Sequence, residues 1–90
     1  MLELTEFKLV LIEWEDSSQP LSSWFRIDDL PEPSHVECVS VGWLIHDGQE
    51  TKMLAPNMGD TDSKENIQAS GIIRIPARAI KRIAPLAERD

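Results

Sequence analysis

The 90-residue sequence is poor in several residue types, and each shortage excludes a class of protein. Its one cysteine, Cys38, cannot form an internal disulfide, which is typical of a reducing compartment. No apolar run approaches the roughly 18 residues of a membrane-spanning helix, and the N-terminal residues lack the basic start of a secretory signal. We therefore expect a cytoplasmic protein with no disulfide and no membrane partner.

Residues and motifs that carry catalysis are also scarce. The two histidines, His35 and His46, lie in no spacing that binds zinc. Glycine-rich phosphate-binding motifs and nucleophile motifs do not occur, and Cys38 lies in an apolar stretch, as a buried, unreactive thiol does. The sequence thus predicts that the protein is not an enzyme and has no metal site, cofactor or catalytic residue.

Basic residues are few as well. Nine Lys and Arg against 16 Asp and Glu give a formal net charge of −7, and such a chain repels polyanions, so we expect no direct nucleic-acid binding. The apolar share of 41% and the charged share of 28% are otherwise ordinary for a globular protein. At this length they predict one domain over residues 1–90.

Apolar runs rich in β-branched residues predict five strands, over residues 7–14, 36–45, 50–55, 71–75 and 80–84. Asp47-Gly48 favours a tight hairpin between the second and third strands, and Gly42 indicates a bulge or bend. Pro76-Ala77-Arg78-Ala79 predicts a single helical turn before the last strand. Two long loops, about residues 16–35 and 57–70, complete the chain.

The first predicted strand is apolar on both faces, so its second face needs a cover. The sequence leaves two candidates for this cover. One is the segment 21–25, in which Leu21, Trp24 and Phe25 have helical spacing; the other is a neighbouring subunit. The two faces consist of Val10, Ile12 and Trp14 on one side and Phe7, Leu9 and Leu11 on the other.

The order of these elements resembles the SH3-like or Sm-like small β-barrel. That resemblance implies a mainly β fold: a small five-stranded barrel with a long first loop and a one-turn helix before the last strand.

Short stretches of the sequence also resemble small proteins encoded by tailed phages and prophages. They are Trp14-Glu15-Asp16, Val41-Gly42-Trp43-Leu44, Leu54-Ala55-Pro56 and Ile75-Pro76 followed by Ile80 and Ile83. The resemblance implies a phage-type protein in the host cytoplasm. Some small barrels of such phages inhibit host defence proteins, and others sequester signalling nucleotides.

Four cations near the C-terminus are the candidate ligand site. Guanidinium and ammonium groups bind phosphate well, and the loop 57–70 supplies polar side chains to recognise the rest of an anionic ligand. Our first hypothesis is therefore non-enzymatic sequestration of an anionic small ligand, such as a signalling nucleotide, to counter host defence. The candidate residues are Arg74, Arg78, Lys81, Arg82, Asn57 and Asn66. The alternative for the cations is simple pairing with the acidic surface.

Two other functions stay open. An acidic protein-interaction module, or an inhibitor of a host protein, would engage a basic surface through an acidic face made of Glu13, Glu15, Asp16, Asp28, Asp29 and Glu32. Hydrophobic docking through aromatic anchors is the other form of this function, and its candidates are Trp24, Phe25 and Trp14. A structural or assembly protein would associate with itself through the second face of the first strand or through sheet edges. We expect a homo-oligomer, which the assembly function needs and which would also place the anionic-ligand site between subunits.

Overall fold

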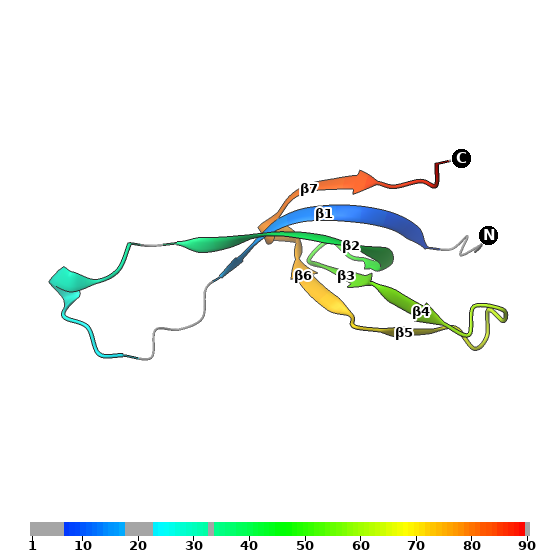
Figure 1. Ribbon diagram of the computed structural model, residues 1–90, viewed down its shortest axis with the longest axis horizontal. Helices are drawn as coiled ribbons and strands as arrows, with labels where there is room; N and C mark the ends of the chain where they lie inside the picture. Colours follow the sequence, from blue (N-terminus) through cyan, green and yellow to red (C-terminus); the bar gives the residue numbers. More distant parts are fainter. Residues whose placement is uncertain (1–6, 18–22, 33, 90) are drawn as a thin grey trace.

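The fold is given by a computed structural model that describes residues 7–17, 23–32 and 34–89 (Figure 1). It is mainly β, as predicted. The elements, in chain order, are β1 (Lys8–Ser17), the 3₁₀ turn η1 (Ile27–Asp29), β2 (His35–Asp47), β3 (Thr51–Ala55), β4 (Asn57–Gly59), β5 (Gln68–Ser70), β6 (Ile73–Pro76), the 3₁₀ turn η2 (Ala77–Ala79) and β7 (Ile80–Pro85).

Five of these strands form one antiparallel sheet in the order β6-β3-β2-β1-β7. They correspond to the five predicted strands, and η2 is the predicted turn before the last one. The Asp47-Gly48 hairpin is also confirmed, since the Gly48 amide donates a hydrogen bond to the Thr51 carbonyl at 3.1 Å. Among the described residues β6 and β7 do not pair with each other, so no closed barrel is found.

The sheet curls around one small core. Val10 and Ile12 of β1 are buried together with Leu54 of β3 and Ile75 of β6, although β1 and β6 are not neighbours in the sheet. Gly42 permits this curvature, because a Cβ there would lie only 2.7 Å from the Ala55 carbonyl oxygen. The bulge expected at Gly42 lies further along β2, where the register shifts between Leu44 and His46.

Residues 57–70 are not the plain loop that the sequence predicts. β4 and β5 form a short second sheet, in which Met58 lies opposite Ala69. These two strands have three residues each and few apolar side chains. The alternation that identifies a strand was therefore too short to recognise.

The predicted helical segment at 21–25 also differs. Leu21 lies outside the described residues, and Trp24 and Phe25 are not helical. The helical turn falls later, at η1, and has three residues. A helix this short is not stable without tertiary packing, and Trp24 is fully exposed. Trp24 and Phe25 therefore do not cover the second face of β1. No helix within the described ranges has the length and apolarity to cross a bilayer.

Candidate functional site

The β1–β2 ladder extends beyond the other strands and forms an arm (Figure 1). Its pairs run from Lys8 opposite Leu44 to Ser17 opposite His35, but β7 pairs with β1 only from Val10 to Trp14. We call residues 23–32 the tip loop, and we call the tip loop together with residues 15–17 and 34–37 the arm. The arm makes the molecule 57 Å long and 26 × 25 Å across, with a Cα radius of gyration of 17.4 Å, against about 12 Å for a compact chain of this length.

The tip loop exposes large apolar side chains to solvent. Trp24 is fully exposed and Ile27 is 81% exposed, and Leu30 and Phe25 are also exposed. Three acidic residues, Asp28, Asp29 and Glu32, accompany a single base in the same loop. An exposed cluster of aromatic and aliphatic side chains at the end of an arm has the composition of a protein-binding anchor.

A cluster of ion pairs stabilises the base of the arm. The Lys81 ammonium lies 2.9 Å from Glu37 Oε1 and 3.2 Å from Glu15 Oε1, and Arg82 Nε lies 3.1 Å from Glu13 Oε2. Glu13 lies opposite Arg82 while Trp14 lies opposite Ile80, so Lys81 is an extra residue, a β-bulge. Because of the bulge, two consecutive cations reach Glu13 and Glu15, which share one face of β1.

These contacts change the acidity of the groups involved. The hydrogen bond from Lys81 lowers the pKa of Glu37 below its ordinary value, and the Lys81 charge adds to the effect. Hydrogen bonds to Glu37 and then to Glu15 raise the pKa of Lys81. Lys81 and Arg82 are therefore already paired with carboxylates of the same chain. For these two cations the structure supports the alternative of pairing with the acidic surface.

Glu15, His35 and Glu37 bring potential metal ligands within 4.8 Å of one another. The sequence analysis missed this group because its members come from two strands and meet only through the β1–β2 register. His35 Nε2 lies 3.3 Å from Glu15 Oε1, and the Lys81 ammonium already contacts both carboxylates. The lysine thus supplies the positive charge that a metal ion would bring.

The other predicted ligand residues lie in separate elements. Arg74 is on the exposed side of β6, opposite Met53 of β3. Arg78 of η2 lines an open hollow of about 560 Å³, together with Glu50 and Thr51. Asn57 lies in β4, opposite Ser70. The described structure does not gather the six residues into one site.

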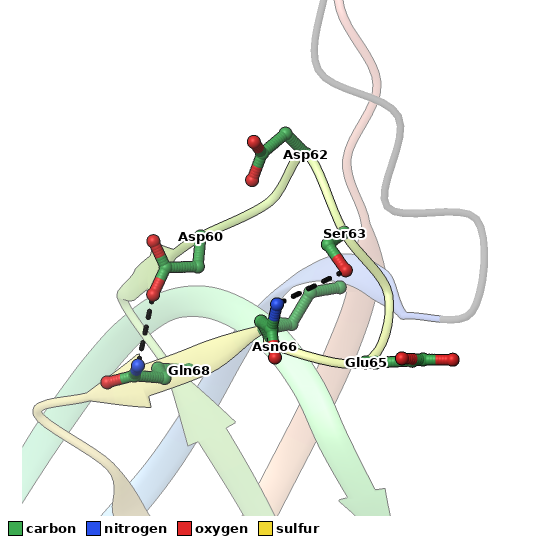
Figure 2. A pocket seen from close by; sticks show the side chains of 7 residues that line it. Asp60, Asp62, Ser63, Glu65, Asn66 and Gln68 are labelled. Atoms are coloured by element: carbon green, nitrogen blue, oxygen red, sulfur yellow. Dashed lines mark hydrogen bonds between the residues drawn. The ribbon is translucent and has the colours of Figure 1, made fainter.

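Asn66 lies in an acidic hollow at the end of the β4–β5 hairpin (Figure 2). Its amide donates to Ser63 Oγ at 3.5 Å, and across the hollow Gln68 Nε2 donates to Asp60 Oδ2 at 3.0 Å. Carboxylates in this hollow, of about 620 Å³, would repel an anion. The residues that line it are Asp60, Asp62, Ser63, Glu65, Asn66, Ile67 and Gln68.

Two of the three predicted interface residues lie together. Trp24 and Phe25 are neighbours in the tip loop, whereas Trp14 packs against the buried core and donates a hydrogen bond from Nε1 to Ser40 Oγ at 3.1 Å. The tip loop is therefore the candidate docking surface, and Trp14 belongs to its support.

Comparison with protein-family models, with curated proteins and with solved structures finds no match. The candidate surfaces are therefore argued from the residues of this chain alone.

Proposed function

We propose that the protein is a non-enzymatic protein-interaction module that docks onto a partner protein through the tip loop of its arm. The observation that carries this proposal is the exposure of Trp24 and Ile27 on an arm that extends from the body. Burying such side chains stabilises a complex by about 1.5–3 kcal/mol for each one that becomes fully covered. Tryptophan is also among the residues that most often dominate binding energy.

The acidic residues of the tip loop define the kind of partner. Asp28 and Asp29 lie directly beside Ile27, in the same 3₁₀ turn. A matching surface has an apolar pocket for the aromatic ring and basic residues around it, since complementary charges speed association and exclude wrong partners. Inhibition of a host protein, one of the functions that the sequence leaves open, is one form of this function.

A photo-reactive amino acid at position 24 tests the proposal, with position 72 as the matched control. Ile72 is also an exposed apolar residue, 43% accessible, but it lies between β5 and β6 and not in the arm. We expect irradiation in lysate of the source cells to yield one adduct from position 24 that position 72 does not yield, and Ile27→Asp to remove it. No adduct from position 24, or the same adducts from both positions, would contradict the proposal.

The anionic-ligand hypothesis remains a second proposal in a narrower form. Arg78 lines a hollow, and neither Arg74 nor Arg78 has an ion-pair partner among the residues that the structure describes. A thermal-shift screen of cyclic and linear nucleotides tests it. A nucleotide that raises the melting temperature of the wild type but not of Arg74→Ala or Arg78→Ala would support the hypothesis. If none of the nucleotides raised the melting temperature, the hypothesis would be contradicted.

We also propose that the curled sheet is an SH3-like or Sm-like barrel that has an open side. The strand order β6-β3-β2-β1-β7 and the 3₁₀ turn between β6 and β7 support this assignment. In such a barrel the turn lets the chain cross from one edge of the sheet to the other. The phage or prophage origin stays a prediction from the sequence.

A further inference from the structure

One edge of β2 has no neighbouring strand over half of its length. β3 pairs with β2 only between Trp43 and Asp47. On the side away from β1, residues His35–Val41 therefore pair with no strand among the described residues. We call this stretch the free edge. Its backbone groups are available to another strand, as in complexes formed by strand addition.

The free edge lacks the features that normally prevent two edges from pairing. Edges are usually protected by lysine, proline, bulges or very short length. β7 has the Lys81 bulge and ends at Pro85, and β6 has four residues and ends at Pro76. Within the free edge there is no lysine or proline, and its one carboxylate, Glu37, is paired with Lys81.

Exposed valines flank the free edge on both faces of the sheet. Val39 and Val41 are 64% and 48% exposed on one face, and Val36 is 52% exposed on the other. A strand added at this edge would cover part of all three side chains. Cross-strand contacts of β-branched residues stabilise such a pair.

One antiparallel register pairs the free edge with itself over its full length, and that register is centred on Cys38. Two-fold symmetry requires one residue to face its own copy. When that residue is Cys38, Glu37 faces Val39 of the second copy and no two like charges face each other. A register centred on Glu37 would place two carboxylates opposite each other, which is destabilising. One centred on Val39 pairs fewer residues of the free edge, because Val36 would then face Gly42, where Ala55 of β3 lies close to β2.

We propose that the free edge pairs with the free edge of a second copy, antiparallel and centred on Cys38. The result is a dimer with a continuous β1–β2–β2–β1 sheet, whose two tip loops lie at opposite ends. This surface is separate from the tip loop, so the dimer and the docking function succeed or fail independently.

Substitutions at Val39 test the pairing, because this residue faces Glu37 of the second copy in the proposed register. Val39→Glu creates two like-charge contacts, and we expect the dimer dissociation constant, measured by sedimentation equilibrium, to rise about tenfold or more. Val39→Lys creates two opposite-charge contacts instead and should leave the dimer as tight as in the wild type or tighter. Circular dichroism and thermal melting establish that both variants fold.

Cross-linking at Cys38 tests the register. Residues directly opposite in an antiparallel ladder have Cα atoms about 4.5–5.5 Å apart, which suits a disulfide. We expect mild oxidation to produce a covalent dimer of the wild type and none of Cys38→Ser. A wild-type protein that stays monomeric at the highest attainable concentration would overturn the proposal. A dimer that Val39→Glu does not weaken would also overturn it. The register would be wrong if the double variant Val39→Cys, Cys38→Ser formed a disulfide-linked dimer and the wild type did not.

Discussion

At the scale of single residues, Gly42 has the clearest structural requirement. It is buried in β2, and a Cβ there would lie 2.7 Å from the Ala55 carbonyl oxygen and 2.9 Å from its carbon, both backbone atoms that cannot move aside cheaply. We expect Gly42→Ala to lower the free energy of unfolding by about 1–3 kcal/mol, as overpacking does. Chemical denaturation measures this, with Gly59→Ala as the control.

Gly59 is the matched control because nothing lies within 4 Å of a Cβ at that position. The control should change stability by no more than about 0.5 kcal/mol. Equal effects of the two substitutions would show that β3 does not approach β2 as closely as described.

Lys81 determines how the arm responds to pH. The lowered pKa of Glu37 means that its contribution to stability is present above its ordinary value of 4.5 and is lost as the pH falls. The raised pKa of Lys81 means that its contribution is present below 10.5 and is lost as the pH rises through the raised value. The pair is therefore fully formed between these two limits.

Lys81→Met tests this pH dependence. At neutral pH the variant leaves Glu15 and Glu37 close together without a cation, so it should melt at a lower temperature than the wild type. As the pH falls well below 4.5, Glu37 becomes protonated in the wild type as well as in the variant, and the difference in melting temperature should shrink. A difference that is the same at pH 3 and pH 7 would mean that the pair does not form.

At the scale of elements, β6 depends on one buried side chain. It has four residues, pairs with β3 and with no other strand that the structure describes, and places Ile75, fully buried, in the core. We expect Ile75→Ala to lower the free energy of unfolding by about 2–5 kcal/mol, as other buried Ile-to-Ala changes do. Ile72→Ala, at an exposed position of the same segment, should have much less effect. The urea midpoints of the two variants measure the difference, and a larger loss for Ile72→Ala would contradict the assigned core.

The parts of the strands that consist of continuous apolar runs could be predicted from the sequence. The polar residues by which some strands continue beyond those runs could not. The first strand was expected to end at Trp14 but continues to Ser17. Glu15 and Asp16 interrupt the apolar pattern, and only the cross-strand register with Glu37 and Val36 shows that they belong to the ladder. The same register creates the ion pairs of Lys81, which no spacing along the chain reveals.

The candidate site was predictable only where a local feature was sufficient. Trp24 was named as a candidate for an exposed ring because an aromatic residue in a polar loop is informative on its own, and the structure shows it fully exposed. The cations at 74–82 are adjacent in sequence, but the turn η2 and the bulge at Lys81 distribute them over two edge strands and the turn between them. Their separation depends on the topology of the sheet, and the spacing of the charges along the sequence does not reveal that topology.

At the scale of the whole molecule, the shape depends on the β1–β2 ladder, which extends from the body and holds an uncovered tip loop away from it. The molecule is accordingly elongated, with dimensions of 57 × 26 × 25 Å. The docking function depends on this shape, because a tip loop folded back onto the body would bury Trp24 within the chain.

Amide hydrogen exchange of the isolated protein tests whether the ladder is ordered and the tip loop uncovered. Amides of the β1–β2 ladder that hydrogen-bond across it should be protected as far as residues 15–17 and 35–37. The tip-loop amides of residues 23–32 should exchange close to the rates of an unstructured peptide, apart from Asp29, whose amide donates to the Arg26 carbonyl at 2.9 Å. Strong protection throughout the tip loop, or none at residues 35–37, would contradict the account.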